Sequence, residues 1–97
     1  MARYGLFGKF TAVAGQRDAL LALLRDAAAM VRQAPGCEAW IVHTSPTDPD
    51  GIWIYEAWRS EADHDASLAD ERIRAIIGDA RPLIADIADQ VKLDVVA

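Results

Sequence analysis

Cysteine is almost absent from this sequence, since Cys37 is the only one in 97 residues. A single cysteine cannot close an intrachain disulfide, and no spacing of Cys and His residues resembles a zinc site. Basic residues are also scarce, with ten Lys and Arg against fifteen Asp and Glu and a formal net charge of -5. Binding to nucleic acid or to an anionic membrane needs a concentrated basic surface, so both classes of partner are excluded.

Long hydrophobic runs are missing as well. Gly5, Gly8 and Lys9 interrupt the apolar N-terminal stretch before a signal-peptide core can form. No later stretch approaches the about 20 apolar residues that a helix needs to span a bilayer. We therefore expect a soluble protein of the reducing cytoplasm.

Apolar residues are plentiful in spite of these absences, at 53% of the 97 residues. A chain of this length forms one domain, here residues 1–97, and buries only about 60 to 65% of the surface that its unfolded form exposes. The sequence holds more apolar material than one small core can easily hide. This excess predicts an oligomer.

The hydrophobic periodicity changes several times along the chain. Alternation with β-branched and aromatic residues indicates strands, and the i, i+3, i+4 spacing of Leu20, Leu24 and Ala27 indicates a helical face. Turn residues fill positions 45–51, and a loop is expected at 86–89. The expected elements are a strand over 4–13, a helix from Gly15 to about Gln33, hairpin strands over 37–44 and 52–58, a short helix from Ser60 to Leu68 with Ser60 as its cap, a helical stretch over 73–84 bent at Gly78 and Pro82, and a last strand over 91–95.

The order β, α, β, β, α, β predicts an α+β fold of the ferredoxin-like, split βαβ kind. A four-stranded antiparallel sheet then carries its helices on one face. The third strand is apolar on both sides: Ile52, Ile54 and Trp58 lie on one side. Trp53 and Tyr55 lie on the other, which the helices cannot cover. We expect the sheet of a second copy to cover it, giving a two-fold dimer; the alternative is a monomer with an exposed aromatic sheet.

Five segments carry a resemblance to a known family. They are AGQRDAL at residues 14–20, PGC at 35–37, YEAWRS at 55–60, HDASL at 64–68 and ARPLI at 80–84. In order and spacing they resemble the antibiotic biosynthesis monooxygenase family. The resemblance implies a dimeric α+β barrel with an apolar pocket between sheet and helices in each subunit. It also implies relatives that oxidise phenols or quinols with O2 and without flavin or metal, beside others that degrade haem.

One position departs from the family pattern. Many quinol-oxidising relatives carry a histidine nine residues after the aromatic residue that ends the third strand, where this sequence has Ser67. His64 lies three residues earlier, one helical turn away. Imidazole has the unperturbed pKa nearest neutrality, so His64 is the candidate general base.

Glu56 is the second candidate catalytic residue, because a carboxylate in the most apolar strand needs a partner or a raised pKa. It is expected to orient His64 or to hold a substrate hydroxyl; the alternative is a structural ion pair with an arginine. Trp58 and Trp40 are candidates to stack on an aromatic substrate, and Ser67 is a candidate hydrogen-bond donor to it. Trp58, Glu56 and His64 are expected to line one cavity within a subunit.

Three functions compete at this point. The first is a monooxygenase that needs no cofactor or metal and oxidises a small phenol or quinol with O2. The second is a non-catalytic dimeric module that binds an apolar small molecule. The third is haem degradation, for which His64 is the available axial ligand, although nothing in the sequence singles it out.

Overall fold

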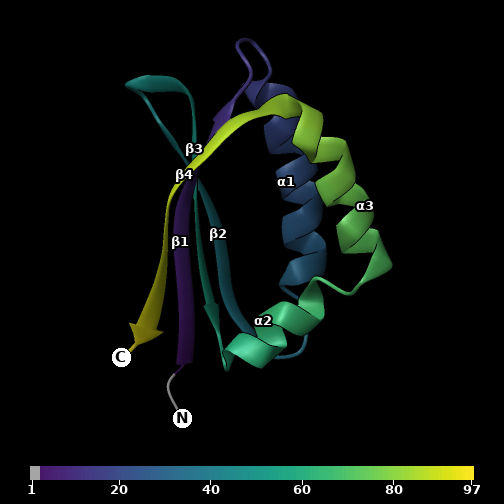
Figure 1. Ribbon diagram of the computed structural model, residues 1–97, viewed down its shortest axis with the longest axis vertical. Helices are drawn as coiled ribbons and strands as arrows, with labels where there is room; N and C mark the ends of the chain where they lie inside the picture. Colours follow the sequence, from purple (N-terminus) through teal and green to yellow (C-terminus); the bar gives the residue numbers. More distant parts are fainter. Residues whose placement is uncertain (1–2) are drawn as a thin grey trace.

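The computed structural model describes residues 3–97 and has the predicted element order, with one additional short helix (Figure 1). No helix among the described residues is long and apolar enough to cross a membrane. The elements are β1 (Arg3–Ala12), α1 (Arg17–Val31), β2 (Cys37–Ser45), β3 (Asp48–Trp58), α2 (Glu61–Ser67), α3 (Glu71–Ala80), the 3-10 helix η1 (Arg81–Leu83) and β4 (Ile84–Val95).

The four strands form one antiparallel sheet in the order β2-β3-β1-β4, as the ferredoxin-like fold requires. Figure 1 shows the helices on one face of this sheet, with α2 at the end where β3 stops and the opposite face without any cover. The register pairs Tyr4 of β1 with Trp58 of β3, and Trp40 of β2 with Glu56 of β3. Four side chains from three strands therefore gather at the end of the sheet that α2 covers.

The two faces of β3 are divided as the alternation predicts. Ile52, Ile54 and Trp58 are buried against the helices, and Trp58 and Ile52 are fully inaccessible to solvent. Trp53 and Tyr55 lie on the uncovered face and are only half-buried. The uncovered face also carries exposed apolar side chains from β1 and β4, namely Phe7, Val91 and Leu93.

The short helix α2 begins as its sequence predicts. The Ser60 side-chain oxygen accepts a hydrogen bond from the Asp63 backbone N–H at 3.2 Å, so it satisfies one of the free donors of the first turn. Only two residues separate the end of β3 from the first residue of α2. This tight connection turns the chain back over the end of its own strand.

Two predicted boundaries are wrong. The hairpin turn is shorter than residues 45–51, because both strands continue until only Pro46 and Thr47 form the turn. The last strand begins at Ile84, so the expected loop at 86–89 belongs to β4, as does the end of the expected helical stretch over 73–84. A register shift opposite Gly8 marks a bulge in this edge strand, and Asp89 has a φ of 54° there.

Candidate active site

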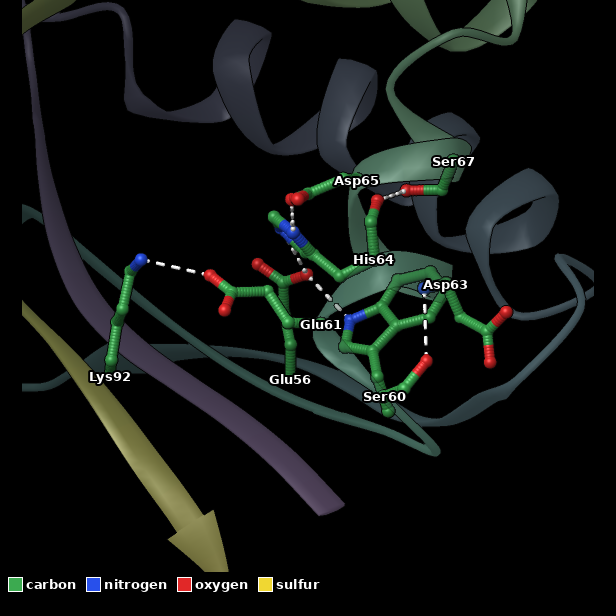
Figure 2. Close-up of polar contacts among 9 residues, drawn as sticks. Glu56, Ser60, Glu61, Asp63, His64, Asp65, Ser67 and Lys92 are labelled. Carbon is green, nitrogen blue, oxygen red and sulfur yellow. Dashed lines mark hydrogen bonds and ion pairs between the residues drawn. The ribbon is translucent and has the colours of Figure 1, made fainter. Parts of the chain in front are cut away.

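The candidate site lies where α2 crosses the helix-facing side of the sheet (Figure 2). We call Tyr4, Glu56, Trp58 and His64 the His64 cluster. Glu56 and Trp58 share one face of β3, Tyr4 lies on the neighbouring β1, and His64 comes from α2. The cluster thus joins two strands and a helix, and three of its members are candidates from the sequence.

His64 lies between two carboxylates. Its Nδ1 is 2.9 Å from Oδ1 of Asp65, and its Nε2 is 3.8 Å from Oε1 of Glu56. The first distance is a hydrogen bond, whereas the second is a charge contact that is too long for one. Aromatic rings enclose the imidazole, with the Tyr4 ring centroid at 5.2 Å and the Trp58 centroid at 5.7 Å in an edge-on arrangement. The imidazole is therefore held at one nitrogen, while the other points towards a second polar group.

Glu56 is the polar group in the apolar part of the cluster. Trp58 Nε1 donates a hydrogen bond to Glu56 Oε1 at 3.1 Å. Burial raises the pKa of the Glu56 carboxyl, and this shift is opposed by the Trp58 hydrogen bond, by the charge of His64 and by the indole of Trp40. Among residues 3–97, His64 is the only basic side chain within 4.0 Å of Glu56. The alternative of a structural pair with an arginine is therefore wrong.

Tyr4 belongs to the cluster although the sequence interpretation treats it only as a strand residue. Burial raises the pKa of its phenol, Glu61 adds to the rise, and Lys92 opposes it. Figure 2 shows Lys92 paired with Glu61 at the border of the cluster, at 2.9 Å. Because the Tyr4–Trp58 pairing joins residues far apart in sequence, only the register of β1 against β3 reveals it.

The two remaining candidates take different positions. Trp40 is buried and lies directly across from Glu56 on β2, next to the cluster. Ser67 is buried too, but its hydroxyl donates a 2.6 Å hydrogen bond to the backbone carbonyl of His64. Its side chain also lines a separate cavity of about 360 Å³ between α1 and the helices α2 and α3. The structure therefore brings Trp40 to the cluster and places the Ser67 hydroxyl on the backbone of α2.

The rings of the cluster are buried, with Trp58 0% and Tyr4 8% exposed. Three cavities of about 360 to 450 Å³ among residues 3–97 lie elsewhere, since none of these three is lined by Glu56, Trp58 or His64. The side chains of His64 and Glu56 remain 13% and 16% exposed, so both polar groups reach solvent at the edge of the cluster. Within the described part of the chain, no group of three or more His, Cys, Asp and Glu side chains could hold a metal ion. The arrangement places an imidazole beside a carboxyl group whose pKa is raised by burial, with aromatic rings next to both.

Fold and cluster together define an α+β protein of the ferredoxin-like class with a histidine and a glutamate side by side under the short helix α2. A sequence model of the antibiotic biosynthesis monooxygenase family matches residues 3–78. The chain belongs to this family, which supports a monooxygenase-like role.

Solved structures agree with this assignment. A crystal structure from Chloroflexus aurantiacus J-10-fl, named as a candidate antibiotic biosynthesis monooxygenase, is 42% identical with a TM-score of 0.92, and the match covers 99% of this chain and 95% of the other. PA3566 from Pseudomonas aeruginosa is 23% identical with a TM-score of 0.89, over 100% of this chain and 97% of its own. At that identity the likeness shows the fold alone. A comparison with curated proteins finds no match.

Proposed function

We propose that this protein is a cofactor-independent monooxygenase that oxidises a small phenol or quinol with O2. The observation that carries the proposal is the position of His64, with one ring nitrogen held by Asp65 and the other directed towards Glu56. Family membership supports the reaction class. The buried rings of Tyr4 and Trp58 pack against the imidazole and give His64 an apolar surrounding on that side.

In the proposed reaction His64 removes the phenolic proton. The resulting phenolate is electron-rich and transfers an electron to O2, which the neutral phenol does far less readily. Oxygen then bonds to a ring carbon that carries hydrogen, which is para to the hydroxyl of a phenol or adjacent to one hydroxyl of a quinol. Overall, one phenol and one O2 give one quinone and one water: one oxygen atom enters the ring, and the other leaves with the hydroxyl hydrogen and the para hydrogen.

Glu56 supplies the second proton-transfer group of the proposal. Loss of water from the ring-bound peroxide requires a proton on the departing oxygen. Burial raises the Glu56 pKa, so its carboxyl holds a proton more readily than an exposed one does. Together, His64 as base and Glu56 as acid provide both transfers. The proton returns from His64 to Glu56 when their contact, 3.8 Å in this structure, shortens to hydrogen-bond distance.

The active form that we propose is a two-fold dimer. Phe7, Val91 and Leu93 are exposed on the uncovered face of the sheet, beside the half-buried Trp53 and Tyr55. Monomers rarely expose a contiguous apolar patch of this kind. A second sheet packed face to face would cover it without using the helix side, where the His64 cluster lies.

Oxygen consumption with a panel of substituted phenols and hydroquinones tests the proposed function. We expect saturable uptake by the protein as purified, and one atom of 18O from 18O2 in the quinone product when the substrate is a phenol. Two atoms of label in the product, or no uptake with any member of the panel, would contradict the monooxygenase. Binding of the same aromatics without oxygen uptake would favour the non-catalytic module, and haemin breakdown would favour the haem reaction.

A further inference from the structure

A groove between α1 and the edge strand β2 forms a second, separate feature of the surface. Its volume is about 380 Å³, in the range of small-molecule sites. None of the His64 cluster lines it. One wall comes from α1, with Leu21, Arg25 and Ala28 on the helix and Arg32 as its C-cap, and the other wall comes from Ile41, Val42 and Thr44 on β2.

The α1 wall follows directly from helical spacing. Leu21, Arg25, Ala28 and Arg32 are separated by four, three and four residues, so they form one continuous stripe along the helix. Apolar and basic side chains alternate in this stripe. A molecule in the groove therefore meets an apolar floor and two guanidinium groups.

Arg32 is already fixed in position. Its Nε and Nη2 atoms donate hydrogen bonds to the backbone carbonyl of Trp40, at 3.1 Å and 2.9 Å. These bonds use one edge of the guanidinium and leave the Nη1–Nη2 edge, which is the edge that pairs with a carboxylate through two parallel hydrogen bonds. Because Trp40 holds the group in place, little side-chain entropy is lost when an anion binds.

The charges of the groove are unusual for this acidic protein. Most of its basic side chains contact a carboxylate, in the pairs Arg3–Glu38, Lys9–Asp48, Arg17–Asp18, Arg59–Asp63, Arg72–Asp70 and Lys92–Glu61. Among residues 3–97, Arg25 and Arg32 have no carboxylate within 4.0 Å, yet both line the same groove. A pair of uncompensated guanidinium groups over an apolar floor is complementary to an amphipathic anion.

We propose that the groove binds a small carboxylic acid with an aromatic or branched apolar body. The carboxylate would pair with the free edge of Arg32 and with Arg25. The apolar body would lie against Leu21, Ala28 and Val42. This site is additional to the proposed catalytic function and does not depend on it, because the two share no side chain.

Titration of the 15N-labelled protein with 2-naphthoate, followed by NMR, tests the proposal. We expect saturable shifts of the amides of residues 21–32 and 41–44. The uncharged 2-naphthylmethanol should bind about tenfold more weakly or worse, since it cannot form the charge-assisted hydrogen bonds. Inorganic phosphate, which lacks the apolar body, should also bind more weakly than 2-naphthoate.

Two variants and a control locate the charges. Arg25→Gln should weaken 2-naphthoate binding about tenfold without touching the Trp40 contact, and Arg32→Lys should weaken it because an ammonium lacks the two-pronged edge. Arg74→Gln is the matched control, since Arg74 is also exposed and has no carboxylate within 4.0 Å among the described residues, but does not line the groove. It should bind as the wild type does.

Several results would overturn the site. These are no shifts at millimolar 2-naphthoate, shifts centred on the His64 cluster, or equal affinity for the acid and the alcohol. If Arg32→Lys does not fold, Arg25→Gln remains the test of the site, because Arg25 makes no bond that the fold requires. Equal weakening in Arg25→Gln and Arg74→Gln would show a general charge effect and would contradict a defined site.

Discussion

Phe7→Glu is the substitution that tests the proposed dimer most sharply. Phe7 lies on β1 in the uncovered face, between Tyr55 of β3 and Val91 of β4. Its side chain is 36% exposed in the single chain, so a glutamate there meets water in a monomer and costs the fold little. In a face-to-face dimer the same carboxylate would lie between two sheets.

The size of the effect follows from the dimensions of the sheet. Four strands about 4.8 Å apart, each contributing about eight residues of about 3.4 Å, give a face of roughly 500 Å² in projection. Side chains make the accessible area larger, near the about 800 Å² that each partner gives to an interface of standard size. Phe7→Glu would bury one carboxylate from each copy, at a cost of several kcal/mol per charge. Even about 3 kcal/mol in total weakens the dimer about 100-fold.

Sedimentation velocity over a concentration series measures this change. We expect wild-type protein to sediment as a dimer at micromolar concentration and Phe7→Glu as a monomer with an unchanged circular dichroism spectrum. Ala29→Glu, at an exposed position on α1, is the matched control and should remain a dimer. Monomeric wild-type protein, or a Phe7→Glu dimer as tight as the wild type, would refute the face-to-face packing.

Three further substitutions test the cluster and its support. Burial raises the pKa of Glu56 in the folded protein, so the folded protein keeps this proton up to a higher pH than the unfolded chain does. The unfolding free energy of the wild type therefore falls as the pH rises from the pKa of Glu56 in the unfolded chain through its pKa in the folded protein. In urea titrations the unfolding free energy of Glu56→Gln should therefore rise relative to that of the wild type as the pH increases above 4.5, the ordinary pKa of this carboxyl; a constant difference would contradict the raised pKa. Ser60→Ala removes the α2 cap and should cost about 1 kcal/mol in the same assay, while no loss would show that the cap is unimportant. Gly36→Ala should lower the melting temperature more than Ser60→Ala does, because Gly36 has a φ of 82° and an added Cβ would meet the Asp63 side chain; an unchanged melting temperature would contradict this.

Local patterns in the sequence predict most of the fold. The alternation of Ile52, Ile54 and Trp58 identifies the buried face of β3, and Ser60 identifies the start of α2, because both signals lie within a few residues. The start of β4 is different. Acidic residues at 86 and 89 resemble a loop, and only pairing with β1 makes them part of an edge strand with a bulge.

The candidate site shows the same division between local and distant information. Glu56, Trp58 and His64 lie within nine residues of one another, so strand parity and one helical turn are enough to bring them together. Tyr4 lies more than fifty residues before Trp58, and nothing in its neighbourhood identifies the contact. The position of Ser67 in the family pattern predicts a hydrogen bond to substrate, whereas in the structure its hydroxyl donates to the backbone carbonyl of His64.

The most direct test of the proposed activity is oxygen uptake with a hydroquinone by wild type, His64→Ala and His43→Ala across a range of pH. His43 is the other histidine of the chain and lies exposed on β2 opposite Trp53, in the uncovered face. Its variant controls for the loss of an imidazole, and sedimentation velocity checks that it remains a dimer. We predict that His64→Ala lowers turnover roughly 100-fold near neutral pH while His43→Ala does not. The deficit should shrink at high pH, where the substrate loses its proton without a base. Full turnover by His64→Ala across the whole range, with the fold and the oligomeric state intact, would contradict the role of His64 as the base.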